Sequence, residues 1–295
     1  MAISGIYRQL ITAAVVVLLV AGMYATGKLL GRATEQRPAS GTAAPSASST
    51  PPGSSHPSIA PAPAPRGAPR PDTAFVPPVM VSPTASPVPP PEFGPLGALT
   101  VAGTAYAALT FDDGPDPRWT PQVLEVLRFH GVRATFCVVG ENAAAHPELI
   151  RLIVAEGHTL CNHSWNHDVG LGERARAEIE ADLLRTNAAI RAAVPGAEIA
   201  YYRQPGGAWT PEVVEVAEEL GMTALHWTVD PQDWQQPAAR EISTVVRNAV
   251  FPGAIVLLHD GGGDRQGTVR AVDLILGQAP QRVDFGALPA TPPQL

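Results

Sequence analysis

Two histidines four residues apart are the first candidates for metal chemistry in this sequence. A spacing of four places His163 and His167 on one face of a helical turn, so both imidazoles can reach one ion. Imidazole nitrogen suits Zn²⁺, at Zn–N distances of about 2.0–2.1 Å. Surface or capping histidines show the same spacing. A catalytic site therefore also needs a carboxylate from another segment and open positions for water and substrate.

Two adjacent carboxylates can complete such a site. Asp112 and Asp113 directly precede Gly114 and Pro115, and a turn there can aim both side chains into one mouth. One carboxylate would bind the ion and the other would act as general base for the metal-bound water. The alternative is a turn without chemistry, because Asp-Gly-Pro is favourable turn sequence.

A third histidine ends a strongly apolar run. His259 follows residues 255–258, which read as a buried strand. It is either a core histidine or, opposite a metal-bound base, the general acid for a leaving group. Such a proton transfer contributes on the order of 10²–10⁴ in rate.

The elements that must position these residues alternate between short apolar strands and helical patterns. We expect strands over residues 106–111, 134–139, 159–162, 201–203, 223–229 and 254–259. Helices are expected from Thr120 (as N-cap) to Gly131, over residues 147–156 and 171–194, and from Thr210 (as N-cap) to Gly221. This alternation predicts parallel strands with crossover helices, an α/β fold. About 190 residues suffice for a compact, incomplete barrel, whose chemistry gathers at the carboxyl ends of the strands.

Taken together, the polar segments at those strand ends resemble the polysaccharide deacetylases of the NodB-homology type, carbohydrate esterase family 4. The matches follow the family's order: T-F-D-D-G-P at 110–115, H-S-x-x-H at 163–167, R-x-P-x-G at 203–207, D-x-x-D-W at 230–234 and L-x-H at 257–259. The resemblance covers about residues 103–280 and implies a distorted (β/α)7 barrel.

The resemblance also implies a role for each site residue. The metal ligands would be Asp113, His163 and His167, and the ion Zn²⁺, with Co²⁺, Mn²⁺ and Ni²⁺ as alternatives. The catalytic groups would be Asp112 as base, His259 as acid, Arg203 orienting Asp112, and Asp233 orienting His259.

The resemblance further implies how the acetyl group is bound. The backbone N–H of Gly206 would stabilise the oxyanion, and Trp234 and Leu257 would line the methyl pocket. Many members have an aromatic residue where this chain has Gly206. Glycine keeps the N–H but lacks the ring, so the wall of the sugar site differs here.

The expected function is therefore metal-dependent removal of N-acetyl groups from an N-acetylglucosamine polysaccharide, first peptidoglycan and second chitin oligomers. Three alternatives stay open: an O-acetyl esterase on xylan or a related glycan, a catalytically silent glycan-binding protein, and a glycosidase with paired carboxylates. The glycosidase would cleave the chain and ignore chelators. A serine hydrolase has no support, because the sequence contains no G-x-S-x-G element.

The first 98 residues read as an anchor and a spacer. Residues 10–27 carry no charge. The length of this run is at the lower limit for a spanning helix and is long for a signal-peptide core. Residues 1–32 are thus a membrane anchor or a cleaved signal peptide, and both put the rest outside the cytoplasm. Eighteen of the 32 prolines lie between Pro38 and Pro95, so we expect 33–98 to be a disordered linker, either an extended stalk or an inert tail.

Residues 99–295 form the expected catalytic domain. They carry 14 basic and 24 acidic residues, a net charge of −10, which argues against a nucleic-acid partner. We expect a monomer. Cys137 and Cys161 lie in neighbouring expected strands and can form a disulfide outside the cytoplasm; two buried thiols are the alternative.

Overall fold

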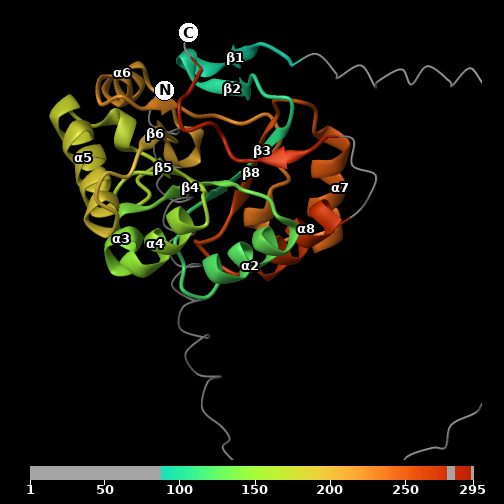
Figure 1. The fold of residues 1–295 in the computed structure, drawn as a ribbon. Coiled ribbons are helices and arrows are strands. Elements are labelled where there is room, and N and C mark those ends of the chain that lie inside the picture. Colours follow the sequence, from blue (N-terminus) through green and yellow to red (C-terminus); the bar gives the residue numbers. More distant parts are fainter. Residues whose placement is uncertain (1–87, 278–282, 294–295) are drawn as a thin grey trace, which may run out of the picture. The chain divides into compact units, whose positions relative to one another are not determined.

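The computed structural model describes residues 88–277 and 283–293 (Figure 1). The predicted anchor, residues 10–27, and nearly all of the predicted linker lie outside these residues. Within the described ranges, no helix is both long and apolar enough to cross a membrane.

The centre of the fold is a parallel sheet. Its strands are β3 (Ala107–Asp112), β4 (Thr135–Val138), β5 (Thr159–Asn162), β6 (Ile199–Tyr202), β7 (Thr223–Ala224), β8 (Ile255–His259) and β9 (Phe285–Gly286). The order is β7-β6-β5-β4-β3-β8, with β9 pairing to the start of β3. All of these pairs are parallel. The predicted α/β class with parallel strands is confirmed.

The sheet curls until its two ends approach each other. The backbone N–H groups of Thr228 and Val229, beyond β7, donate to the carbonyl of Ile255 in β8. The predicted strand over 223–229 is therefore too long: β7 stops at Ala224, because the chain then leaves β6 and crosses to β8. The result is a curled, incompletely closed barrel.

Helices cover the outside of the sheet (Figure 1). They are α2 (Thr120–His130), α3 (Gly140–Ala145), α4 (Pro147–Ala155), α5 (Arg176–Ala193), α6 (Pro211–Glu219), α7 (Ala239–Ala249) and α8 (Gln266–Gly277). Short 3₁₀ turns are η1 (Pro95–Gly97), η2 (Leu171–Glu173), η3 (Pro205–Gly207) and η4 (Asp233–Gln235).

Several helix ends follow the predicted signals. The hydroxyl of Thr210 accepts the N–H of Val213 and caps α6, and Gly131 ends α2 in the left-handed conformation. The predicted helix over 171–194 is wrong at its start. Ala175 is extended, so it separates η2 from α5, which begins at Arg176.

Thr120 differs from its predicted role as a cap. It is the first residue of α2, and its hydroxyl bonds outside the helix. The predicted linker also extends too far, because β1 (Pro91–Phe93) pairs antiparallel with β2 (Leu99–Ala102).

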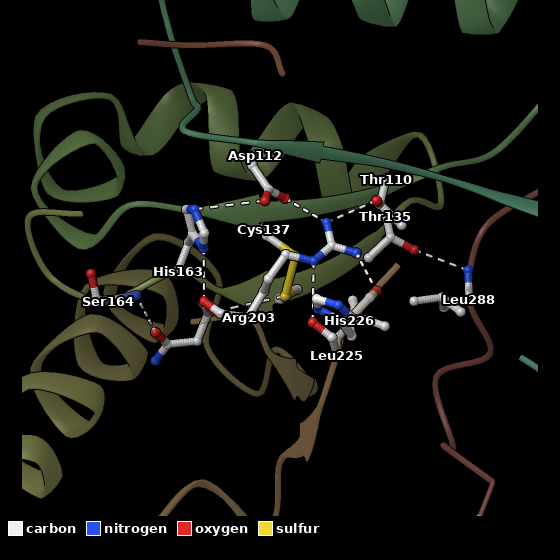
Figure 2. Close-up of a disulfide and its surroundings, with 12 residues drawn as sticks. Thr110, Asp112, Thr135, Cys137, His163, Ser164, Arg203, Leu225, His226 and Leu288 are labelled. Atoms are coloured by element: carbon white, nitrogen blue, oxygen red, sulfur yellow. Dashed lines mark hydrogen bonds and ion pairs between the residues drawn. A yellow bond between two sulfur atoms is a disulfide. The ribbon is translucent and has the colours of Figure 1, made fainter. Parts of the chain in front are cut away.

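A buried apolar cluster inside the barrel includes the two cysteines, which form a disulfide (Figure 2). Cys137 of β4 and Cys161 of β5 are register partners, fully buried, and bonded to each other. Disulfides persist in oxidising compartments, so this bond favours the predicted location outside the cytoplasm.

Candidate metal centre and catalytic groups

The polar side chains meet at the carboxyl ends of the strands. Asp112 ends β3 and His259 ends β8, and these two residues are register partners in adjacent strands. His163 follows β5 and Arg203 follows β6. Because parallel strands end at one rim, residues far apart in the sequence become neighbours, as predicted from the alternating pattern.

Three of these side chains surround one point. Oδ1 of Asp113 lies 3.5 Å from Nε2 of His163 and 3.3 Å from Nε2 of His167. The three ligand atoms all lie within 4.8 Å of one another. They form the one such cluster with three or more residues in the parts of the chain that the structure describes.

The predicted helical turn between the two histidines is wrong. Residues 164–166 form an irregular turn. Ser164, at its start, and His167, directly after it, have left-handed φ angles of 62° and 57°. The side chain of Asn162 holds this turn by accepting the N–H of Ser164 at 2.9 Å. The reversal of the chain, rather than helical spacing, brings the two imidazoles together.

The chemistry of the cluster fits a divalent metal ion. Nδ1 of His163 donates to the backbone carbonyl of Arg203 at 2.8 Å, which leaves Nε2 free to coordinate (Figure 2). Oδ1 of Asp113 is buried without a hydrogen-bond partner. Two imidazole nitrogens and one carboxylate oxygen leave open positions for water and substrate. We call Asp113, His163 and His167 the metal triad.

Charge determines the protonation of the triad. Burial alone would raise the pKa of Asp113, but its interactions with His163 hold it well below its usual range. Burial would lower the pKa of His163, but the charges of Asp112 and Asp113 outweigh it and raise the pKa. For His167, burial and the charge of His163 lower the pKa. A cation bound at this point would favour the neutral form of His163, whose Nε2 carries no proton.

Asp112 is fixed by a buried guanidinium. Nη1 of Arg203 donates to Oδ1 of Asp112 at 2.7 Å and to the hydroxyl of Thr110 at 2.8 Å (Figure 2). The other nitrogens of Arg203 donate to the carbonyls of Leu225 and His226. Oδ2 of Asp112 remains free of Arg203 and lies 3.7 Å from Nε2 of His163. One oxygen of Asp112 is therefore anchored, and the other faces the metal triad.

His259 and Asp233 form the second pair. Nδ1 of His259 lies 2.6 Å from Oδ1 of Asp233, and its backbone N–H donates to Oδ2 at 3.0 Å. The hydroxyl of Thr268, on α8, also donates to Oδ2. Burial would lower the pKa of His259, but the charge of Asp233 outweighs it and raises the pKa. The imidazole can therefore carry a proton on Nε2.

The predicted substrate-binding residues lie at the same rim. Gly206, in η3, has a φ of 63°, and a Cβ added there would lie 3.3 Å from Cγ1 of Val169. Leu257 is buried in β8. Trp234 is 51% exposed. The roles of Gly206, Leu257 and Trp234 in binding the acetyl group stay predictions.

Several residues that contact the site were assigned no role from the sequence. Asp260 is fully buried next to His259; burial raises its pKa to about 7. The side chain of Asn142 donates to the carbonyl of Asp113 at 2.8 Å. Asp260 could have been identified from the sequence, because it directly follows the L-x-H segment at 257–259. Thr268 and Asn142 lie far in sequence from the residues they contact, so no local pattern identified them.

Comparisons with known proteins agree with this geometry. The family model described as polysaccharide deacetylase matches residues 102–225. The chain is 43% identical over 220 residues to a chitooligosaccharide deacetylase of Bradyrhizobium sp. (strain ANU 289), covering 69% of this chain and 99% of that protein. It is 40% identical over 172 residues to a peptidoglycan-N-acetylglucosamine deacetylase of Bacillus cereus, covering 57% and 79%. The crystal structure of the Bc1960 peptidoglycan N-acetylglucosamine deacetylase superimposes with a TM-score of 0.61 at 34% identity, covering 64% and 89%.

Proposed function

Because this chain belongs to the polysaccharide deacetylases of carbohydrate esterase family 4, we propose that it removes N-acetyl groups from N-acetylglucosamine residues of a polysaccharide. The observation that carries this proposal is the convergence of the metal triad with Asp112 and His259 at one rim. Amide hydrolysis needs an activated nucleophile and an acid for a poor leaving group, and this rim offers a candidate for each.

The metal triad would hold Zn²⁺, with Co²⁺, Mn²⁺ or Ni²⁺ as alternatives. Bound there, the ion would polarise the acetyl carbonyl and lower the pKa of the attacking water. The hydrogen bond from His163 to the carbonyl of Arg203 would keep the imidazole in the coordinating tautomer.

Asp112 would act as the base. Its Oδ1 is held by Arg203, so Oδ2 is the oxygen that can accept a proton from the water. Arg203 orients the carboxylate and compensates its charge in a site that excludes solvent.

His259 would act as the acid for the departing amine. Asp233 accepts from Nδ1 and leaves Nε2–H as the group that can donate. The N–H of Gly206 would stabilise the oxyanion; losing such a donor typically costs about 10²–10³ in rate. Leu257 and Trp234 would contact the acetyl methyl group.

Peptidoglycan is the first proposed substrate. The predicted anchor and linker would hold the domain within reach of a glycan layer above a membrane, and the disulfide fits that compartment. Chitin oligomers are the second substrate, because the chitooligosaccharide deacetylase is matched over nearly its whole length.

Acetate release tests the proposal. The chain is stripped with a chelator, reloaded with Zn²⁺, and incubated with peptidoglycan, chitin oligomers and O-acetylated xylan. We expect metal-dependent acetate release, with free amines, from an N-acetylated glycan. Release from xylan alone would identify an O-acetyl esterase. Chelator-resistant chain cleavage would identify a glycosidase, and binding without release a silent protein; each result contradicts the proposal.

A further inference from the structure

A buried carboxyl group that the proposed mechanism does not use lies beside the metal triad. Asp260 follows His259 at the end of β8 and is 1% exposed. Its Oδ2 accepts the hydroxyl of Thr120 at 2.5 Å. Its Oδ1 has no hydrogen-bond partner among the residues that the structure describes. Burying a carboxyl oxygen without a partner costs free energy, so other contacts of Asp260 must compensate for that cost.

Those contacts hold both ends of the loop that carries Asp113. The backbone N–H of Asp260 donates to the carbonyl of Asp112 at 3.0 Å. At the other end, the hydroxyl of Thr120, which donates to Asp260, accepts the N–H of Asp116 at 2.7 Å. Asp260, which directly follows β8, and Thr120, the first residue of α2, thus hold residues 112–116 at both ends.

The middle of this loop rests on the carboxyl group itself. A Cβ at Gly114 would overlap both carboxylate oxygens of Asp260, so the backbone passes directly against them. The preceding residue, Asp113, has a left-handed φ of 72°. That conformation is strained for a non-glycine residue, and it persists only where the surroundings enforce it.

We propose that Asp260 is a positioning residue for the metal site. Its hydrogen bond with Thr120 and its contact with Gly114 hold the loop of residues 112–116 in the conformation that points Oδ1 of Asp113 at His163 and His167. This inference rests on the proposed function, because it takes Asp113 as a metal ligand. Without these two contacts of Asp260, Asp113 relaxes to an ordinary backbone conformation and its Oδ1 moves away from His163 and His167.

The test measures metal affinity rather than turnover. The full chain is stripped of metal and titrated with Co²⁺, and the visible absorption of the bound ion reports both affinity and ligand geometry. Asp260→Ala and Thr120→Val remove the hydrogen bond. We expect each to weaken Co²⁺ binding by about 10–100-fold, the usual effect of losing a residue that orients a ligand, and to change the spectrum.

Conservative variants separate positioning from general damage. Asp260→Asn keeps an oxygen that accepts from Thr120, and Thr120→Ser keeps the hydroxyl, so both should bind Co²⁺ close to wild type. Thr135→Val is the matched control, because its fully buried hydroxyl accepts the N–H of Leu288 at the amino end of β4. It should leave affinity unchanged. The melting temperature shows that each variant is folded.

The outcomes that overturn the inference are distinct. Wild-type affinity and spectrum in Asp260→Ala would show that the carboxyl does not position the loop. An equal loss of Co²⁺ affinity in Asp260→Asn and Asp260→Ala would refute a role for the hydrogen bond between Thr120 and Asp260. The same loss in Thr135→Val would refute it too. If wild-type protein binds no Co²⁺, the proposed function itself fails.

Discussion

The charge of Asp233 should set the pH at which activity is lost on the alkaline side. Asp233→Asn keeps an oxygen within reach of Nδ1 of His259 but removes the charge. The bond is 2.6 Å long and Asp233 is 1% exposed, so solvent screens it little. A hydrogen bond to a charged group contributes about 1.5–3 kcal/mol. A neutral acceptor in the same place keeps roughly half of this, because charge-assisted hydrogen bonds are about twice as strong as neutral ones. At 1.36 kcal/mol per pH unit, the pH at which activity falls should therefore move by about 0.5–1 unit.

The sign follows from the role of His259. An acid works only when protonated, so activity falls as pH rises through its pKa. Since Asp233 raises the pKa of His259, its replacement moves this fall to lower pH. The assay is acetate release, with kcat/KM and kcat measured against pH. Thr268→Val removes the hydroxyl that donates to Asp233 and keeps the charge, so its alkaline limb should stay near wild type. A uniform loss in Asp233→Asn, with no shift of that limb, would refute the reasoning.

Three further predictions concern the base, its partner and the disulfide. Asp112→Asn should retain the metal, measured by elemental analysis, while kcat falls by about 10²–10⁴, because a positioned base is lost; equal loss of metal would contradict the separate roles of Asp112 and Asp113. Arg203→Met should lower the free energy of unfolding by about 3–5 kcal/mol in urea titrations, because it leaves the buried charge of Asp112 unpaired; a neutral effect would contradict that pairing. Replacing Cys137 and Cys161 by Ser should lower it by about 3–4 kcal/mol, given their separation of 24 residues, and an unchanged urea midpoint would show that the bond constrains the unfolded chain little.

The strand-end chemistry was predictable from local sequence. Apolar runs followed by polar residues placed Asp112, His163 and His259 at one rim, because parallel strands end together. The caps at Thr210 and Gly131 could be predicted because each depends on the residue itself. Thr210 caps with its own hydroxyl, and Gly131 adopts a left-handed conformation because it has no side chain.

Features set by long-range contacts were not predictable in this way. β7 is short because residues 228–229 bond to β8, which no local pattern reveals. The sequence predicts Thr120 as a helix cap, but its hydroxyl donates instead to the buried carboxyl group of Asp260, 140 residues away. The turn between His163 and His167 has the spacing of a helix without its conformation. Spacing constrains which residues can meet, and tertiary contacts decide how they do so.

Locating the ion tests the central claim most directly. Anomalous diffraction from Zn²⁺-loaded crystals, with metal-to-protein ratios in solution, would place it relative to the triad. We predict one ion bound by Oδ1 of Asp113 and Nε2 of both His163 and His167. His163→Ala should lose the ion, whereas His130→Ala, whose ring bonds Asp273 on α8, should keep it. An ion bound elsewhere, or retained by His163→Ala with wild-type affinity, would contradict the account.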